Sequence, residues 1–136
     1  MNEKKWPGEY LPKDAEVIFS ARLPSLSPST NHTYSCTRGG IYYKKTEVKD
    51  WQAAVSCIFA NLYGKPVPCE KEVGFYIYLK TKNKRRLDAD NRIKSVQDCL
   101  KMAGVLKDDS QIWDLRVIRD VDRSLKEDEC EVIVFI

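Results

Sequence analysis

Residues 73–104 read VGFYIYLKTKNKRRLDADNRIKSVQDCLKMAG, and this stretch decides the fold. Apolar and polar residues alternate through its first eight positions, which predicts a strand over 73–80 with one buried face. The later positions change to helical spacing and end at Gly104, which predicts a helix over 90–103. The apolar side of that helix carries Ile93, Val96, Leu100 and Ala103.

The flanking sequence supplies the remaining elements. Residues 16–23 (EVIFSARL) predict a first strand, and the Ser- and Pro-rich residues 24–40 predict a long loop before a short strand at 41–44. A helix is predicted over 46–63, and alternation predicts two more strands, around 113–117 and over 130–136. The stripe expected to bury the 46–63 helix is Trp51, Val55, Ile58 and Leu62.

Taken together, these elements predict an α+β fold. A chain of 136 residues has the size of a single small domain. A mixed β-sheet with two helices packed on it would bury the apolar faces of this element order. The domain is predicted to span 15–136, and the polar residues 1–14 are expected to form a loose N-terminal arm.

Composition narrows the class of protein. The net charge of +3 is too small to identify a partner, and no apolar run approaches the roughly 20 residues that span a bilayer. No secretory signal is visible, so we expect a cytoplasmic protein without a membrane segment. No Cys-x-x-Cys pair accompanies His32, so a zinc site is not expected. Three cysteines are expected to be small buried hydrophobes: Cys57, Cys99 and Cys130.

An acidic constellation follows the 73–80 strand. Asp88 and Asp90 are two residues apart at the entry to a helix, so both carboxylates can face one point. Lys94 lies four residues after Asp90 on the same helix face. Asp108 and Asp109 come after a helix roughly 20 Å long, so the chain must double back if they are to join the others.

Such a cluster suits a divalent cation. Neighbouring carboxylates repel one another, and Mg²⁺ takes oxygen ligands while sharing its shell with a substrate phosphate. The bound ion polarises a phosphoryl oxygen and activates water for attack. Lys94 would then supply a fixed positive charge in the transition state, or orient the attacking water.

Structural interpretations of the same residues remain open on spacing alone. Asp90 or Asn91 suits a helix N-cap, and Asp90 with Lys94 suits an ordinary surface pair. Residues 108–110 suit a plain turn.

A basic run leads directly into the acidic residues. Positive charge beside a carboxylate cluster fits phosphodiester cleavage, because cations hold the backbone of a nucleic acid while the metal acts on it. The residues concerned are Lys80, Lys82, Lys84, Arg85 and Arg86. No base-reading motif is visible, so shape and phosphate are the expected targets.

The combined motif resembles that of the RusA-type Holliday junction resolvases. The resemblance covers roughly 18–136 and rests on Asp88-Ala-Asp90-Asn91-x-x-Lys94-x-x-x-Asp98-x-Leu100, on Ala103-Gly104-x-x-x-Asp108-Asp109-Ser-Gln111, and on Leu23-Pro24 with Pro28-Ser29-x-Asn31 upstream.

The resemblance implies a homodimer that nicks four-way junctions in pairs, with Mg²⁺ as cofactor or Mn²⁺ as a substitute. It implies that Asp88, Asp90 and Asp109 bind the metal, that Lys94 is the essential lysine, and that Asp108 is the neighbouring acidic position. The expected role is in DNA recombination and repair.

Two other functions compete with that one. The chain would be a branched-DNA-binding protein that does not cut, or a metal-dependent nuclease acting on other DNA or RNA structures. A pure binder has no use for a cluster of mutually repelling carboxylates, which favours a nuclease.

Overall fold

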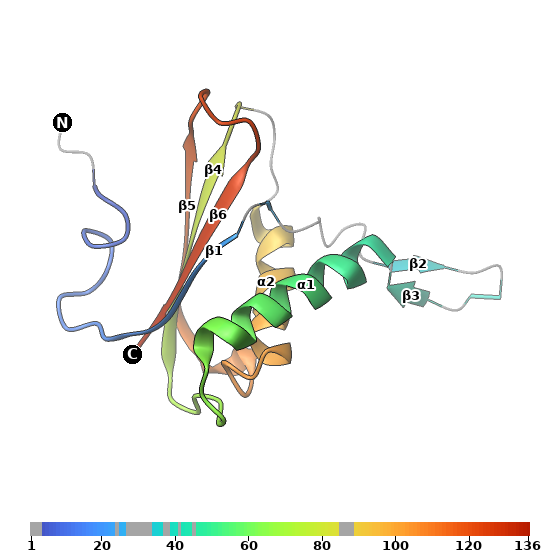
Figure 1. Ribbon diagram of the computed structural model, residues 1–136, viewed down its shortest axis with the longest axis horizontal. Helices are drawn as coiled ribbons and strands as arrows, with labels where there is room; N and C mark the ends of the chain where they lie inside the picture. Colours follow the sequence, from blue (N-terminus) through green and yellow to red (C-terminus); the bar gives the residue numbers. More distant parts are fainter. Residues whose placement is uncertain are drawn as a thin grey trace.

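A computed structural model describes residues 4–23, 25–26, 34–36, 39–40, 42–44, 46–84 and 89–136. Of residues 34–36, 42–44, 46 and 89–91 it describes the backbone alone. The elements in chain order are β1 (Val17–Leu23), β2 (Tyr34–Cys36), β3 (Tyr42–Lys44), α1 (Thr46–Tyr63), β4 (Val73–Thr81), α2 (Ala89–Met102), the 3-10 helix η2 (Asp109–Gln111), β5 (Ile112–Val121) and β6 (Glu129–Phe135). Figure 1 shows α1 and α2 together on one side of the sheet.

The central sheet has the strand order β1-β6-β4-β5. Strands β4 and β5 pair in parallel, while β6 pairs antiparallel with both β1 and β4. A parallel pair needs a crossover connection, and α2 supplies it. The predicted α+β fold with a mixed sheet and two helices is therefore confirmed.

The 24–40 stretch is not wholly a loop. Strand β2 lies within it and pairs antiparallel with β3, with Tyr34 opposite Lys44. The expected short strand at 41–44 corresponds to β3. The sequence gives little sign of β2, because three residues are too few for a recognisable alternation.

The main core lies between the sheet and the helices. The residues that α1 contributes to it differ in part from the apolar stripe predicted for that helix. Phe59 is fully buried, whereas Ile58 and Leu62 are 40% and 57% exposed. Val55 is buried and Trp51 packs against the core as predicted, so half of the predicted stripe is confirmed and Phe59 takes the place of Ile58 and Leu62. Cys99 and Cys130 are buried as expected, but Cys57 is exposed. Within the described part of the chain, no helix has the length and apolar character that a membrane crossing requires.

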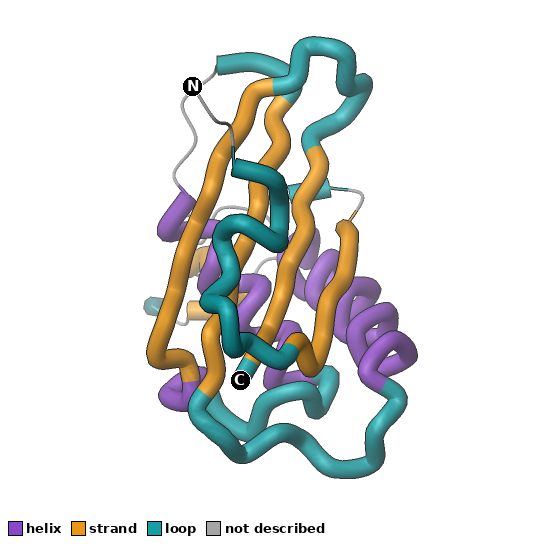
Figure 2. Tube along the Cα trace, turned by 90° about the vertical axis from the view of Figure 1, so that its left-hand side faces the viewer, coloured by secondary structure: helices purple, strands orange, loops and turns teal. Residues whose placement is uncertain are grey.

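The N-terminal arm packs on the other face of the sheet, so the expectation of a loose arm is wrong. Figure 2 shows it crossing in front of the strands, with the helices behind. The Trp6 ring stacks on Tyr78 with centroids 5.0 Å apart. The arm residues Trp6, Tyr10, Leu11 and Ala15 cover a small second core of Tyr76, Ile133 and Phe135. Both faces of β4 are consequently buried, although its sequence predicts only one.

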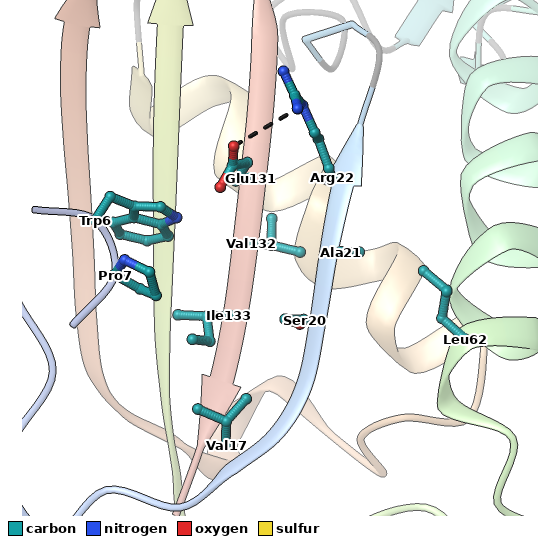
Figure 3. A pocket seen from close by; sticks show the side chains of 10 residues that line it. All are labelled: Trp6, Pro7, Val17, Ser20, Ala21, Arg22, Leu62, Glu131, Val132 and Ile133. Atoms are coloured by element: carbon teal, nitrogen blue, oxygen red, sulfur yellow. Dashed lines mark ion pairs between the residues drawn. The ribbon is translucent and has the colours of Figure 1, made fainter.

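An open pocket adjoins the arm along β1 and β6 (Figure 3). Trp6 and Pro7 form one side of it, beside Ile133. Arg22 stands at its mouth in ion pairs with Glu129 at 2.6 Å and Glu131 at 4.0 Å. Its described lining includes none of the residues predicted for catalysis.

Candidate active site

The chain reverses direction directly after α2. Gly104 adopts a positive φ of 75°, which a residue without a Cβ accepts easily at a helix end. Val105 and Leu106 then turn into the core, with 0% and 2% of their surface exposed. Leu106 forms an isolated parallel bridge with Cys69, next to the start of β4. These contacts carry Asp109 back against α2.

Asp109 closes a ring of alternating charges on α2. The Lys94 Nζ donates a hydrogen bond to Asp109 Oδ2 at 3.0 Å and lies 3.4 Å from Asp98 Oδ1. The Lys101 Nζ lies 3.7 Å from the same Asp98 oxygen and 3.8 Å from the same Asp109 oxygen. Each carboxylate thus faces both ammonium groups. The chain therefore doubles back after α2, and this brings Asp109 into contact with Lys94.

The ring is open to solvent and therefore to a substrate. Side-chain exposure is 53% for Lys94 and 31% for Asp109. The hydrogen bond to Asp109 is the main cause that raises the pKa of Lys94, with Asp98 adding to it and burial opposing it. The Lys94 side chain is therefore positively charged at neutral pH.

Of the two other predicted metal ligands, only Asp90 lies within the residues that the structure describes. Asp88 falls outside the described residues, and of Asp90 the backbone alone is described, in the first turn of α2. Residues four apart share a helix face, so the Asp90 backbone stands about 6 Å along the axis from that of Lys94. Asp109 therefore contacts Lys94 on the helix face that also carries position 90.

The predicted donor set consists of carboxylate oxygens, the ligand type that a hard cation takes. Among the side chains that the structure describes, no group of three or more potential metal ligands comes together. Two of the three predicted carboxylate ligands, those of Asp88 and Asp90, are not among the described side chains. Asp109, which is described, presents an oxygen that already faces the positive charge of Lys94.

Asp108 serves the turn instead. Its carboxylate accepts a hydrogen bond from the Ser110 hydroxyl, and this bond is the main cause that lowers the Asp108 pKa. Residues 108–111 form a capping box around η2, in which Gln111 bonds back to the Asp108 backbone. Two adjacent aspartates thus have different tasks, since Asp108 shapes the turn and Asp109 reaches α2.

The basic run is divided among different surroundings. Lys80 lies over the Tyr78 ring on the face opposite α2, with Nζ 5.5 Å from the centroid. The Lys82 Nζ approaches the Lys126 carbonyl at 3.5 Å, and Lys84 is exposed. Arg85 and Arg86 fall outside the described residues.

Acidic residues from the end of β5 lie beside this run. Lys80 and Lys84 share an open pocket of about 670 Å³ with Asp120, Asp122 and Arg123. The basic run in the sequence contains no acidic residue. The negative charges that lie beside it are therefore visible only in the structure.

Sequence reasoning missed three polar residues around Asp109. Asp98 and Gln111 belong to the quoted motif without an assigned role, and Lys101 is not part of that motif. The spacing of residues 94, 98 and 101 is a sequence signal for the contacts of Asp98 with the two lysines. It repeats at four and three residues, which places all three on one helix face. No local signal indicates that Gln111 bonds to a segment 40 residues earlier.

Comparisons with known proteins found a matching family model and related sequences. A family model described as endodeoxyribonuclease RusA matches residues 25–136. A crossover junction endodeoxyribonuclease RusA of Aquifex aeolicus is 28% identical over 107 residues, which cover 78% of this chain and 81% of that protein. A crossover junction endodeoxyribonuclease of the enterobacteria phage HK97 is 31% identical over 94 residues, covering 69% and 78%.

Proposed function

Because this chain belongs to the RusA endodeoxyribonuclease family, we propose that it resolves four-way DNA junctions by paired symmetric nicks, with Mg²⁺ as cofactor. The resolved junctions would be those formed in DNA recombination and repair. The observation that carries the proposal is the contact between Lys94 and Asp109 on α2. It supports a shared site for residues that are distant in the sequence.

Asp88, Asp90 and Asp109 are the residues that would hold the cation. When bound there, the ion supplies Lewis-acid polarisation of the scissile phosphate and favours attack by water. The chain itself contributes a rigid helix that fixes Lys94 and a short turn that fixes Asp109.

Lys94 would stabilise the negative charge that grows on the phosphate during cleavage. Its raised pKa supports this role, because the side chain stays charged at the pH of the reaction. Asp98 supports it as well, since a second carboxylate keeps the ammonium group on this face of α2.

The DNA would approach along the segment between β4 and α2. Lys84, Arg85 and Arg86 precede Asp88 directly in the sequence, which favours phosphate contacts close to the scissile bond. Lys82 would add to the positive surface around the end of β4, whereas Lys80 lies on the face opposite α2. Contacts of this kind give affinity for backbone and shape.

We further propose that the protein acts as a homodimer. A junction with two-fold symmetry is matched by a protein of the same symmetry. Strand β5 is an edge of the sheet and exposes Trp113 at 73% and Leu115 at 46%, which supports this strand as a subunit contact. Analytical ultracentrifugation of the wild type and of Trp113→Glu tests it, with a shift from dimer to monomer expected.

The decisive test is a cleavage assay on four labelled substrates. The protein is incubated with a synthetic four-way junction, a linear duplex, a single strand and an RNA hairpin, each with and without Mg²⁺. Symmetric nicks that require Mg²⁺ and occur in the junction alone are the expected result. Junction binding without nicks would indicate a non-cleaving binder, and cutting of the hairpin or duplex would indicate a nuclease with another target.

A further inference from the structure

The side-chain amide of Gln111 uses its entire hydrogen-bonding capacity on main-chain groups. Its Oε1 accepts from the backbone N–H groups of Lys107 and Asp108, both at 2.8 Å. Its Nε2 donates to the carbonyl oxygens of Cys69 at 2.7 Å and Lys71 at 2.9 Å. An amide offers two donors and two acceptor positions, so all are occupied and the orientation of the group is fixed.

These bonds join two segments that are far apart in the sequence. Residues 107–108 begin the turn that presents Asp109, and residues 69–71 lead into β4. The hydrogen bonds to Cys69 and Lys71 therefore fix the turn against the segment that leads into β4. Hydrogen bonds within the turn, such as that between Ser110 and Asp108, shape it without fixing its position.

We propose that Gln111 is a positioning residue for the metal site, because it sets the place at which Asp109 meets α2. This inference rests on the proposed function, in which Asp109 binds the cation. Asp109 is the first residue of η2, and Gln111 is the last, so a shift of the turn moves the carboxylate with it.

The geometry of the cation makes that position important. Mg²⁺ demands near-ideal octahedral geometry with oxygen distances of about 2.0–2.1 Å, so a small displacement of one ligand weakens binding. Groups that orient a ligand without touching the metal typically change its affinity by roughly 10–100-fold when they are replaced.

A second tie between the same segments provides a matched control. The Lys107 Nζ and Glu70 Oε1 form an ion pair of 3.1 Å, with side chains 68% and 63% exposed. This pair also bridges the turn and the 69–71 segment, but both of its side chains are exposed to solvent. Glu70→Ala should therefore leave the position of Asp109 unchanged.

The test measures Mn²⁺ binding without DNA, by calorimetry and electron paramagnetic resonance. Gln111→Met keeps the length of the side chain without its hydrogen bonds, and Gln111→Glu keeps the two acceptor contacts without the two donor contacts. We expect both to weaken Mn²⁺ binding about 10-fold or more, and Glu70→Ala to bind as the wild type does. Metal-free junction binding should stay within about twofold in all three, since the basic segment is untouched.

Thermal unfolding separates positioning from simple stabilisation. A Gln111→Glu protein that is less stable but binds Mn²⁺ like the wild type would overturn the proposal, since the amide would then serve the fold alone. Failure of Asp109→Asn to weaken Mn²⁺ binding would instead remove the proposed metal site, and the role of Gln111 with it.

Discussion

Lys94 and Asp109 are in direct hydrogen-bond contact at 3.0 Å although 15 residues separate them in the sequence. The contact exists because the chain reverses at Gly104 and returns along α2. It places a permanent cation and a carboxylate on one helix face, one turn from Asp90. The cleavage mechanism proposed for this chain depends on that juxtaposition.

Replacement of Lys94 by glutamine should lower the rate of junction cutting by about 100-fold or more, because it removes a fixed charge from the transition state. The measurement is single-turnover cutting at saturating Mg²⁺. Lys101→Gln is the matched control, since Lys101 faces the same Asp109 oxygen but stands farther from Asp90. Equal losses in both variants would show that Lys94 has no special role.

Asp90→Asn should abolish cutting and leave junction binding intact or tighter, because it removes a metal ligand and a negative charge that faces phosphate. Gel-shift and cutting assays on the same junction measure both effects. Asp50→Asn makes the same change on the exposed side of α1 and should alter neither. Normal cutting by Asp90→Asn would contradict the site assignment.

The double variant Lys84→Ala with Arg85→Ala should weaken junction binding and flatten its salt dependence. The slope of log affinity against log salt should fall by about one unit for each phosphate that the variant no longer neutralises. A control pair, Lys65→Ala with Lys71→Ala, removes the same charge before β4 rather than after it. An unchanged slope in the first variant would exclude this segment from the DNA interface.

Folding stability should decrease at high pH because of Tyr76. Burial, with a hydrogen bond from its hydroxyl to Asp114, raises the Tyr76 pKa to about 12. The unfolded chain releases this proton near pH 10, so the stabilisation is complete below about 10 and is lost as pH rises toward about 12. The loss should approach about 1.4 kcal/mol per pH unit. Urea unfolding across this range measures it. Tyr76→Phe should remove part of the decline, because the raised pKa values of Tyr78 and Cys130 leave the rest; an equally steep decline in Tyr76→Phe would assign all of it to other groups.

The sequence predicts the elements whose side chains repeat regularly. Alternation in 73–80 and helical spacing in 90–103 identify β4 and α2, because each pattern reflects one buried face. The same reasoning fails for α1, where Ile58 and Phe59 are both apolar and only the packing decides which of them is buried. Local patterns also cannot reveal that Trp6 covers the outer face of β4.

Sequence patterns predict which residues form the candidate site, but only part of its geometry. The spacing of Asp90 and Lys94 fixes their common helix face, because the helix period is known. Local spacing does not distinguish Asp109 from Asp108, and only the family resemblance assigns them different positions; in the structure, Asp108 is the one whose carboxylate accepts a hydrogen bond from Ser110. That choice depends on how Val105 and Leu106 pack into the core, which is a long-range effect.

A crystal of the wild-type protein grown with Mn²⁺ tests the central claim most directly, because anomalous scattering locates the ion without assumptions about its ligands. We predict a peak at bonding distance from a carboxylate oxygen of Asp109 and from at least one of Asp88 and Asp90, with Lys94 beside it. Asp109 still bound to Lys94 and no ion between it and the start of α2 would contradict the account.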